Sequence, residues 1–223
     1  MSNMRTIRVT GKGLIKVHPD MTRITMTLEG MYPEYTDSLR HSAEDTERLK
    51  DVLSPFGFAR SDLKTLNFSV DTAFESYKDK DVYKQRFIGY EFRHVLKVEF
   101  ESDNDRLGKV LYALANSPVR PEFRLSYTVK DPEAVKNTLL GKAVTDAREK
   151  AAVLTEAAGT TLKDIQTIDY SWGEINFEFH PMNRNLMLEE CAAMPSGAGS
   201  YDMDIEPDDI EVSDTVTVVW EIA

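Results

Sequence analysis

The chain has 223 residues, of which 41% are hydrophobic and 29% are charged, and its formal net charge is −11. This length and composition are typical of one large or two small globular domains with enough residues to bury a core. The acidic charge and the lack of a Lys/Arg cluster exclude nucleic acid and anionic membranes as expected partners, because both are bound through clustered cations. No segment approaches the roughly 20 apolar residues of a membrane span.

The first 30 residues predict two strands separated by a break. Apolar and polar residues alternate from Ile7 to Val17 and again from Ile24 to Leu28, which is the period of a half-buried strand. Gly11 and Gly13 interrupt the first run, and glycine inside a strand usually marks a bend or bulge. We therefore expect a bend at these glycines and a break at His18-Pro19-Asp20.

A helix and a hairpin are predicted next. The helix begins near Tyr35 and ends at Gly57, and its apolar residues recur at helical spacing: Leu39, Ala43, Leu49, Val52 and Leu53. Two alternating segments follow, from Asp62 to Tyr77 and from Tyr90 to Phe100, joined across a charged KDKD turn. They read as a long hairpin.

Two more helices are signalled by aspartate caps. Asp103 precedes a short amphipathic helix, and a strand from Phe123 to Val129 comes after it. Asp131-Pro132-Glu133 is a strong helix start, and the helix should run to Ala158, where Gly159 stops it. A stripe of small residues on this helix indicates that another element packs close to it: Ala143, Ala147 and Ala151.

Two strands are predicted near the C-terminus, from Ile165 to Phe179 and from Ile210 to Ile222, with a Met-rich loop from His180 to Asp204 between them. The order of elements predicts an α+β fold with mixed or antiparallel sheets. Residues 24–129 have the β-α-β-β-α-β order of a ferredoxin-like unit, followed by the long helix and two strands. We expect a single domain over residues 1–223, with sub-units at 1–130 and 131–223.

Gly11-Lys12-Gly13 does not fit a phosphate-binding loop. That motif needs four residues between its glycines, a Lys-Ser/Thr after them, and a helix that begins at the phosphate. Here Leu14 and a strand follow. His18 and Asp20 could supply a base and its carboxylate, but no nucleophile is near them, so we interpret His18-Pro19-Asp20 as a turn.

No group of residues has the spacing of a metal or catalytic site. The four histidines (His18, His41, His94 and His180) are far apart, and His94 lies on an apolar strand face, which favours a core or interface histidine. The acidic cluster of Asp202, Asp204, Glu206, Asp208 and Asp209 fails the EF-hand pattern at Pro207 and Ser213, so we interpret it as a solvated loop. Weak cation binding there stays open.

The only cysteine, Cys191, excludes a disulfide within the chain and a metal site built from several thiolates. The neighbouring Glu189 and Glu190 disfavour a reactive thiolate. The N-terminal sequence MSNMRTIRVTGKG lacks the apolar core of a secretory signal, so we expect a cytoplasmic protein. If a signal has been removed, the protein is periplasmic or exported.

Several segments together resemble the SIMPL domain family. They are IRVTGKGLIKVHPDMTRITMTLEG, GFARSDLKTLNFSV, GYEFRHVLKVEF, AVTDAREKAAVLTEAAGTTL and IEPDDIEVSDTVTVVWEI, which occur in this order along nearly the whole chain. The family is named for a mammalian kinase-associated signalling protein and is known in bacteria from oxidative-stress-related and periplasmic immunogenic proteins. The resemblance implies an α+β fold and, in some members, large ring- or channel-like homo-oligomers. It supplies no catalytic motif.

The sequence favours a non-enzymatic, self-associating interaction protein with a role in stress tolerance. We assign no catalytic, cofactor-binding or metal-ligating residue and no cofactor, and we expect a homo-oligomer with a protein partner as a further option. The apolar strands Tyr90–Phe100 and Val212–Ile222 and the loop around Met187 and Leu188 are the expected contact surfaces. The alternative is a small-ligand-binding protein or an enzyme whose site is assembled from His18, Asp20, His94 and the acidic cluster. A kinase-pathway adaptor rests only on the family's namesake.

Overall fold

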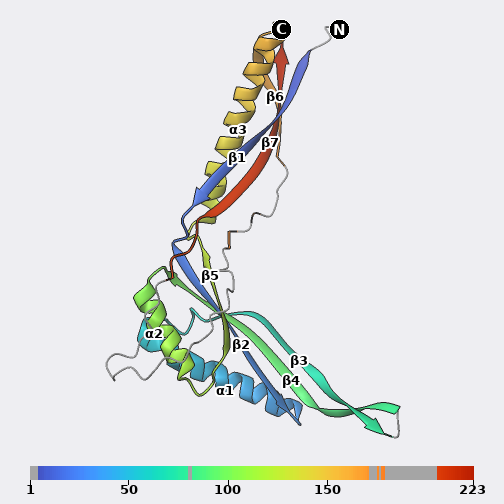
Figure 1. The fold of residues 1–223 in the computed structure, drawn as a ribbon, viewed down its shortest axis with the longest axis vertical. Coiled ribbons are helices and arrows are strands. Elements are labelled where there is room, and N and C mark those ends of the chain that lie inside the picture. The colour runs from blue at the N-terminus through green and yellow to red at the C-terminus, as the bar shows by residue number, and fades with distance from the viewer. Residues whose placement is uncertain (1–4, 80–81, 171–174, 176, 179–204) are drawn as a thin grey trace. The chain divides into compact units, whose positions relative to one another are not determined.

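The computed structural model describes residues 5–79, 82–170, 175, 177–178 and 205–223, and Figure 1 shows its elements. The chain divides into two compact units. Unit 1 comprises Met1–Asp20, Thr128–Phe179 and Pro207–Ala223, and unit 2 comprises Met21–Tyr127 and His180–Glu206. The chain thus passes between the units after Asp20 and again after Tyr127, and the first 20 residues belong to unit 1.

Unit 2 contains a four-stranded sheet with two α-helices. Its elements are β2 (Met21–Tyr32), α1 (Tyr35–Leu53), the 3₁₀ turn η1 (Ser54–Phe56), β3 (Lys64–Asp79), β4 (Val82–Glu101), α2 (Asn104–Ala115) and β5 (Glu122–Thr128). The strand order is β3-β4-β2-β5, so the first and third strands of the unit lie side by side at its centre. The β-α-β-β-α-β prediction and the α+β class are confirmed.

The core of unit 2 lies between one face of the sheet and both helices. Alternate residues of β2 and β4 point into it, because side chains in a strand alternate between the two faces of the sheet. Leu49 and Leu53 of α1 and Leu107 and Val110 of α2 complete this core. The strand residues buried there are Ile24, Met26, Leu28, Phe92, Leu96, Val98 and Phe100.

The predicted apolar stripe on α1 is wrong at its first two positions. Leu39 and Ala43 are exposed, whereas Ser38 and Ser42 are buried. The Ser38 hydroxyl donates to the carbonyl oxygen of Tyr90 at 2.8 Å. This half of the helix therefore contacts β4 through small polar side chains, which an apolar periodicity does not reveal.

Unit 1 is a three-stranded antiparallel sheet with one long helix on one face (Figure 1). Its elements are β1 (Thr6–Val17), α3 (Pro132–Ala157), β6 (Leu162–Asp169) and β7 (Ile210–Ile222), and the strand order is β1-β7-β6. The side chain of Asp131 caps α3 by accepting a hydrogen bond from the Ala134 N–H at 2.9 Å. The side chain of Asp103 caps α2 in the same way, by accepting from the Arg106 N–H at 3.0 Å. Both predicted caps are confirmed.

The predicted bend at Gly11 and Gly13 is wrong. β1 pairs with β7 without a register shift from Thr6 to Val17. Both glycines instead face α3, where a Cβ on Gly11 would overlap the carbonyl oxygen of Ala143 and a Cβ on Gly13 would overlap that of Leu139. Ala143, Ala147 and Ala151 are fully buried against this surface. The close packing predicted from the alanine stripe is confirmed, and the glycines are the reason for it.

Two strands expected to be uncovered lie at the centres of their sheets. β7 lies between β1 and β6, and Trp220 is buried under α3. β4 lies between β3 and β2, and its apolar face forms the core of unit 2. These strands therefore do not supply the apolar surfaces that the sequence suggested.

The predicted strand from Ile165 to Phe179 is too long. β6 ends at Asp169, and Tyr170 leaves the ladder so that its hydroxyl donates to the Asp214 carboxylate at 3.0 Å. Phe177 packs into a small core with Leu139 and Ile210. The whole predicted loop from His180 to Asp204, with Met187, Leu188 and Cys191, lies outside the described residues.

Candidate functional site

The end of the β3–β4 hairpin is the most distinctive surface of unit 2. β2 pairs with β4 as far as Tyr32 opposite Tyr90, and the hairpin continues beyond this pair (Figure 1). In the described part of the chain, residues 74–79 and 82–87 pair only with each other. We call these two segments the arm.

A bulge next to a glycine lies where the arm begins. Ala73 pairs with Gly89, but Phe74 pairs with Phe87, so Ile88 is an extra residue in β4. Gly89 has a φ of +149°, and a Cβ there would overlap the carbonyl oxygen of Tyr32. A residue with a side chain is thus excluded at the point where the arm begins.

The arm exposes large apolar side chains on both faces. Tyr83 is 76% exposed, Phe74 is 54% exposed and Phe87 is 46% exposed. Tyr77 and Val82 are exposed as well. Scattered apolar residues on a surface are normal, but several large ones at one hairpin end make it a candidate interaction surface.

Edge-to-face contacts join the arm to the sheet. The ring centroids of Phe74 and Phe87 are 5.8 Å apart, those of Phe87 and Tyr90 are 5.3 Å apart, and those of Tyr90 and Tyr35 are 5.4 Å apart. Each pair is close to perpendicular, the geometry that aromatic quadrupoles favour. The four rings contact one another in a row, and three of them are exposed to solvent: Phe74, Phe87 and Tyr35. We call it the aromatic row.

The opposite face of the arm carries paired charges. Arg86 and Glu75 lie directly across the two strands, with Nη2 and Oε2 2.6 Å apart. Such an exposed pair contributes little to stability, since both groups are well solvated. Tyr77 and Val82 lie on this face as well, so it carries a charge pair beside apolar side chains.

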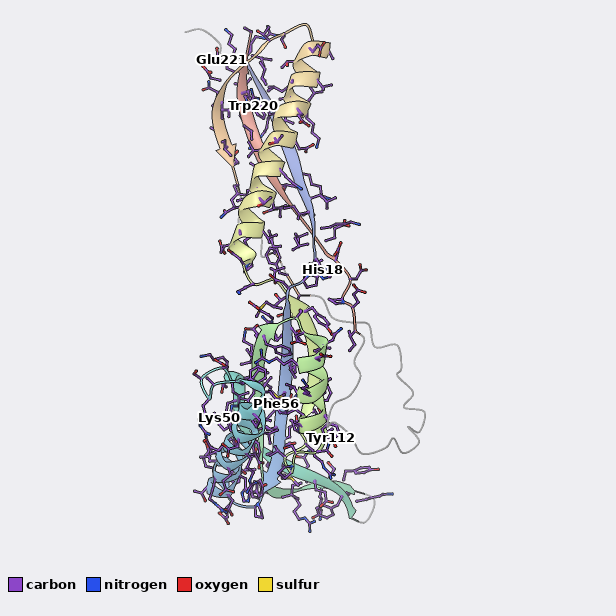
Figure 2. All side chains as sticks on the ribbon, turned by 90° about the vertical axis from the view of Figure 1, so that its left-hand side faces the viewer. His18, Lys50, Phe56, Tyr112, Trp220 and Glu221 are labelled. Atoms are coloured by element: carbon purple, nitrogen blue, oxygen red, sulfur yellow. The ribbon has the colours of Figure 1, made fainter. Side chains whose placement is uncertain are left out.

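In unit 1, His18 and Asp20 each contact a residue that is distant in the sequence. His18 follows the end of β1, at the opposite end of the β1–β7 ladder from Trp220 (Figure 2). Its Nδ1 lies 3.4 Å from Oδ1 of Asp209, and Asp20 accepts from the backbone N–H of Lys130 at 2.7 Å. This geometry agrees with the turn interpretation, and each contact is exposed.

His94 lies in unit 2, between α1 and β3. Its Nδ1 is 3.2 Å from Thr46 Oγ1 and 3.4 Å from Ser42 Oγ, and its Nε2 is 2.9 Å from Thr65 Oγ1. Burial and, to a smaller extent, the positive charge of Lys50 lower the pKa of His94 below its usual 6.5. His94 is thus a neutral interface histidine with partners on both ring nitrogens.

The Ser42–His94 contact is not arranged for nucleophilic catalysis. A serine nucleophile needs access to substrate and a base whose second nitrogen is oriented, usually by a carboxylate. Ser42 is 2% exposed, and the second nitrogen of His94 contacts a threonine hydroxyl. The pair instead joins α1 to the sheet.

The Gly11–Gly13 segment is not arranged to bind phosphate. Both glycines are covered by the α3 backbone, and the Lys12 N–H donates to Asp146 Oδ2 at 2.6 Å. A carboxylate in this position would repel an anion. Its pKa is lowered by hydrogen bonds from the Lys150 side chain and the Lys12 backbone, so it is charged at neutral pH.

The described residues contain no group of three or more His, Cys, Asp and Glu side chains able to hold a metal ion. Of the acidic cluster, Asp202 and Asp204 lie outside those residues, whereas Glu206, Asp208 and Asp209 are described. Asp209 contacts His18, as noted above. Across the same described part of the chain, no helix has the length and apolar composition needed to cross a membrane.

Sequence reasoning found the hairpin but missed the arm. The signal was present in Phe74, Tyr77, Tyr83 and Phe87, which flank the KDKD turn. An aromatic residue in a predicted strand can be either buried or exposed, and the sequence pattern does not distinguish the two. The end of β2 at Tyr32 shows that these residues are exposed, because no strand pairs with β4 beyond Tyr90 on that side.

Known proteins match almost the whole chain. Residues 7–220 match the model of the SIMPL family, described as a protein of unknown function (DUF541). The 26 kDa periplasmic immunogenic proteins of Brucella melitensis and Brucella abortus are each 24% identical over 217 residues, which is 97% of this chain and 84% of each relative.

Proposed function

We propose that this chain, which belongs to the SIMPL family of unknown function, is a non-enzymatic protein that acts by self-association. The observation that carries this proposal is the arm, a hairpin end with exposed Phe74, Tyr83 and Phe87. Burying these side chains against another chain gives a favourable free energy in proportion to the apolar area removed from water.

A catalytic role has weaker support in the described residues. The closest approach to a nucleophile–base pair there is Ser42 with His94, and Ser42 is buried. His18 contacts Asp209, and Asp20 accepts a hydrogen bond from the backbone N–H of Lys130. Both contacts are exposed and connect segments that are distant in the sequence. The proposed function is therefore an interaction function rather than a chemical one.

The names of the two relatives also bear on where the protein acts. Both are called periplasmic proteins. This supports the exported alternative over the cytoplasmic expectation, and we infer that the protein acts outside the cytoplasm. Subcellular fractionation of the native organism tests this: recovery with cytoplasmic marker enzymes contradicts it.

The association is tested with two double variants of the full chain. Phe74→Ser with Phe87→Ser removes the exposed apolar centre of the arm. Val153→Ser with Leu154→Ser removes the same number of exposed apolar side chains from α3 in unit 1 and is the matched control. Light scattering coupled to size-exclusion chromatography should show a smaller assembly for the arm variant and an unchanged one for the control. Equal masses for the arm variant and the wild type contradict the role of the arm.

A further inference from the structure

The described part of the arm that lies farthest from the sheet combines apolar and charged side chains in each cross-strand pair. Three pairs form it: Tyr77 with Lys84, Lys78 with Tyr83, and Asp79 with Val82. We call these six residues the outer end; the arm that carries it extends past β2 in Figure 1. Each of its pairs sets one tyrosine or valine beside one charged group, whereas Phe74 and Phe87, nearer the sheet, form a purely apolar pair.

The outer end exposes apolar side chains on both faces of the two-stranded ribbon. Tyr77 and Val82 are 42% and 58% exposed on one face, and Tyr83 is 76% exposed on the other. They lie on different faces because successive side chains of a strand alternate between its two sides. A flat protein surface would cover one face of the ribbon and leave the other in water. A partner that fits this distribution therefore surrounds the ribbon.

Two kinds of surroundings meet this requirement, a deep pocket in a protein and the interfacial layer of a lipid bilayer. A deep pocket would also remove Lys78, Asp79 and Lys84 from water, which is unfavourable for each charge that gains no partner there. The headgroup layer keeps charged groups hydrated, while apolar side chains beside them reach the boundary of the acyl chains. Tyrosine is enriched at this boundary, because its ring is apolar and its hydroxyl is polar. The mixed pairs of the outer end thus favour the bilayer.

We propose that the outer end inserts into the interfacial layer of a lipid bilayer and holds the protein at a membrane surface. This inference goes beyond the proposed self-association, which buries Phe74 and Phe87. Asp79 lies five residue steps beyond Phe74, roughly 17 Å along an extended strand. The outer end can therefore enter the interfacial layer while the aromatic row stays outside it.

The charge of the arm determines which bilayer it fits. The described arm residues carry three cations, Lys78, Lys84 and Arg86, against two acids, Glu75 and Asp79, a net charge of +1 in a chain of −11. This is too little for attraction to anionic lipid, which requires clustered cations. Binding instead depends on apolar burial, so a bilayer without net charge is sufficient and added salt changes the binding little.

Flotation of the full chain with phosphatidylcholine vesicles tests the proposal. The wild type should rise with the vesicles at about 0.05 M and at about 0.5 M NaCl alike. Tyr77→Ser with Tyr83→Ser should lower the partition coefficient roughly tenfold or more, because two of the three inserting apolar side chains are lost. Ile165→Ser with Ile168→Ser removes two exposed apolar side chains from β6 in unit 1 and is the matched control, which should bind like the wild type. Circular dichroism checks that both variants are folded.

A fluorescent label gives a second readout that keeps all three apolar side chains. In a Cys191→Ala background, Lys84→Cys carries an environment-sensitive dye at the outer end. Its emission should rise and shift to shorter wavelength when vesicles are added, because the dye enters a less polar layer. The same dye at Thr167→Cys, exposed on β6, should not respond.

The outcomes separate this inference from the proposed function. Failure of the wild type to float, equal flotation of the Tyr77→Ser, Tyr83→Ser variant, or an equal response of both dyes overturns the membrane contact. If the wild type does not float and that variant forms a smaller assembly in light scattering, the outer end belongs to a protein–protein contact instead. A wild type that floats but remains monomeric in light scattering overturns self-association and leaves the membrane contact standing.

Discussion

Gly11 and Ala143 lie so close together that a Cβ added to Gly11 would overlap the carbonyl oxygen of Ala143. The same added atom would lie 2.7 Å from the Cβ of Ala147. Strand β1 and helix α3 thus pack with backbone against backbone, and only residues without side chains, or with a single methyl group, fit between them.

Gly11→Ala should therefore destabilise the protein by about 1–3 kcal/mol, the usual cost of overpacking a filled core. Urea unfolding measures this as a lower midpoint. Lys12→Ala is the control, because the Lys12 side chain is exposed and its backbone N–H keeps its bond to Asp146. An unchanged midpoint for Gly11→Ala would mean that β1 and α3 are not in this contact.

Ala147→Leu should be costly for the same reason, again by about 1–3 kcal/mol. Ala147 is fully buried, and its backbone and Cβ are among the atoms nearest to Gly11. The urea midpoint of Ala147→Leu should fall, whereas that of the exposed Arg148→Leu should stay close to the wild type. A similar effect of the two variants would show that the alanine face is not buried.

Gly141→Ala should stabilise the protein by about 0.5–1 kcal/mol. Gly141 lies inside α3, no atom lies within 4 Å of an added Cβ, and alanine loses less backbone entropy than glycine in a helix. Gly159 offers equally open space but has a φ of +67°, so Gly159→Ala should destabilise instead. Thermal unfolding of the two variants should shift in opposite directions. A shift of both in the same direction contradicts this account of the helix and its end.

The stability of the protein should fall as the pH drops below about 6.5 because of His94. Burial and Lys50 lower the pKa of His94 in the folded state, so the unfolded state binds this proton first. The loss begins as pH falls through the unfolded value of 6.5 and levels off below the lowered folded value. His94→Gln should flatten urea midpoints measured from pH 7.5 to pH 5. A slope equal to that of the wild type would rule out His94 as its source.

The sequence predicts the element order well because each signal for it is local. Asp103 and Asp131 cap their helices as expected, and the alternation through β7 needs no tertiary information. The predicted bend at Gly11 was wrong because glycine is needed there for a different reason. It leaves room for helix α3, which lies about 130 positions later in the chain. Local composition does not distinguish a bulge from a close contact with a distant helix.

The candidate site was harder to predict for a related reason. Phe74 and Phe87 have the alternation of core residues, and their exposure depends on β2 ending at Tyr32. The strands expected to be uncovered are central in their sheets, since strand order is not encoded in the periodicity of any single strand. Exposed edges could therefore be assigned only once the pairing was known.

Sedimentation velocity of the wild-type chain, from one to about one hundred micromolar, tests the central claim most directly. The calculated mass of one chain is 25.3 kDa. Self-association predicts a species of at least twice this mass, whose share rises with concentration and falls in the Phe74→Ser, Phe87→Ser variant. A single 25.3 kDa species over the whole range would contradict the account and favour a small-ligand-binding role instead.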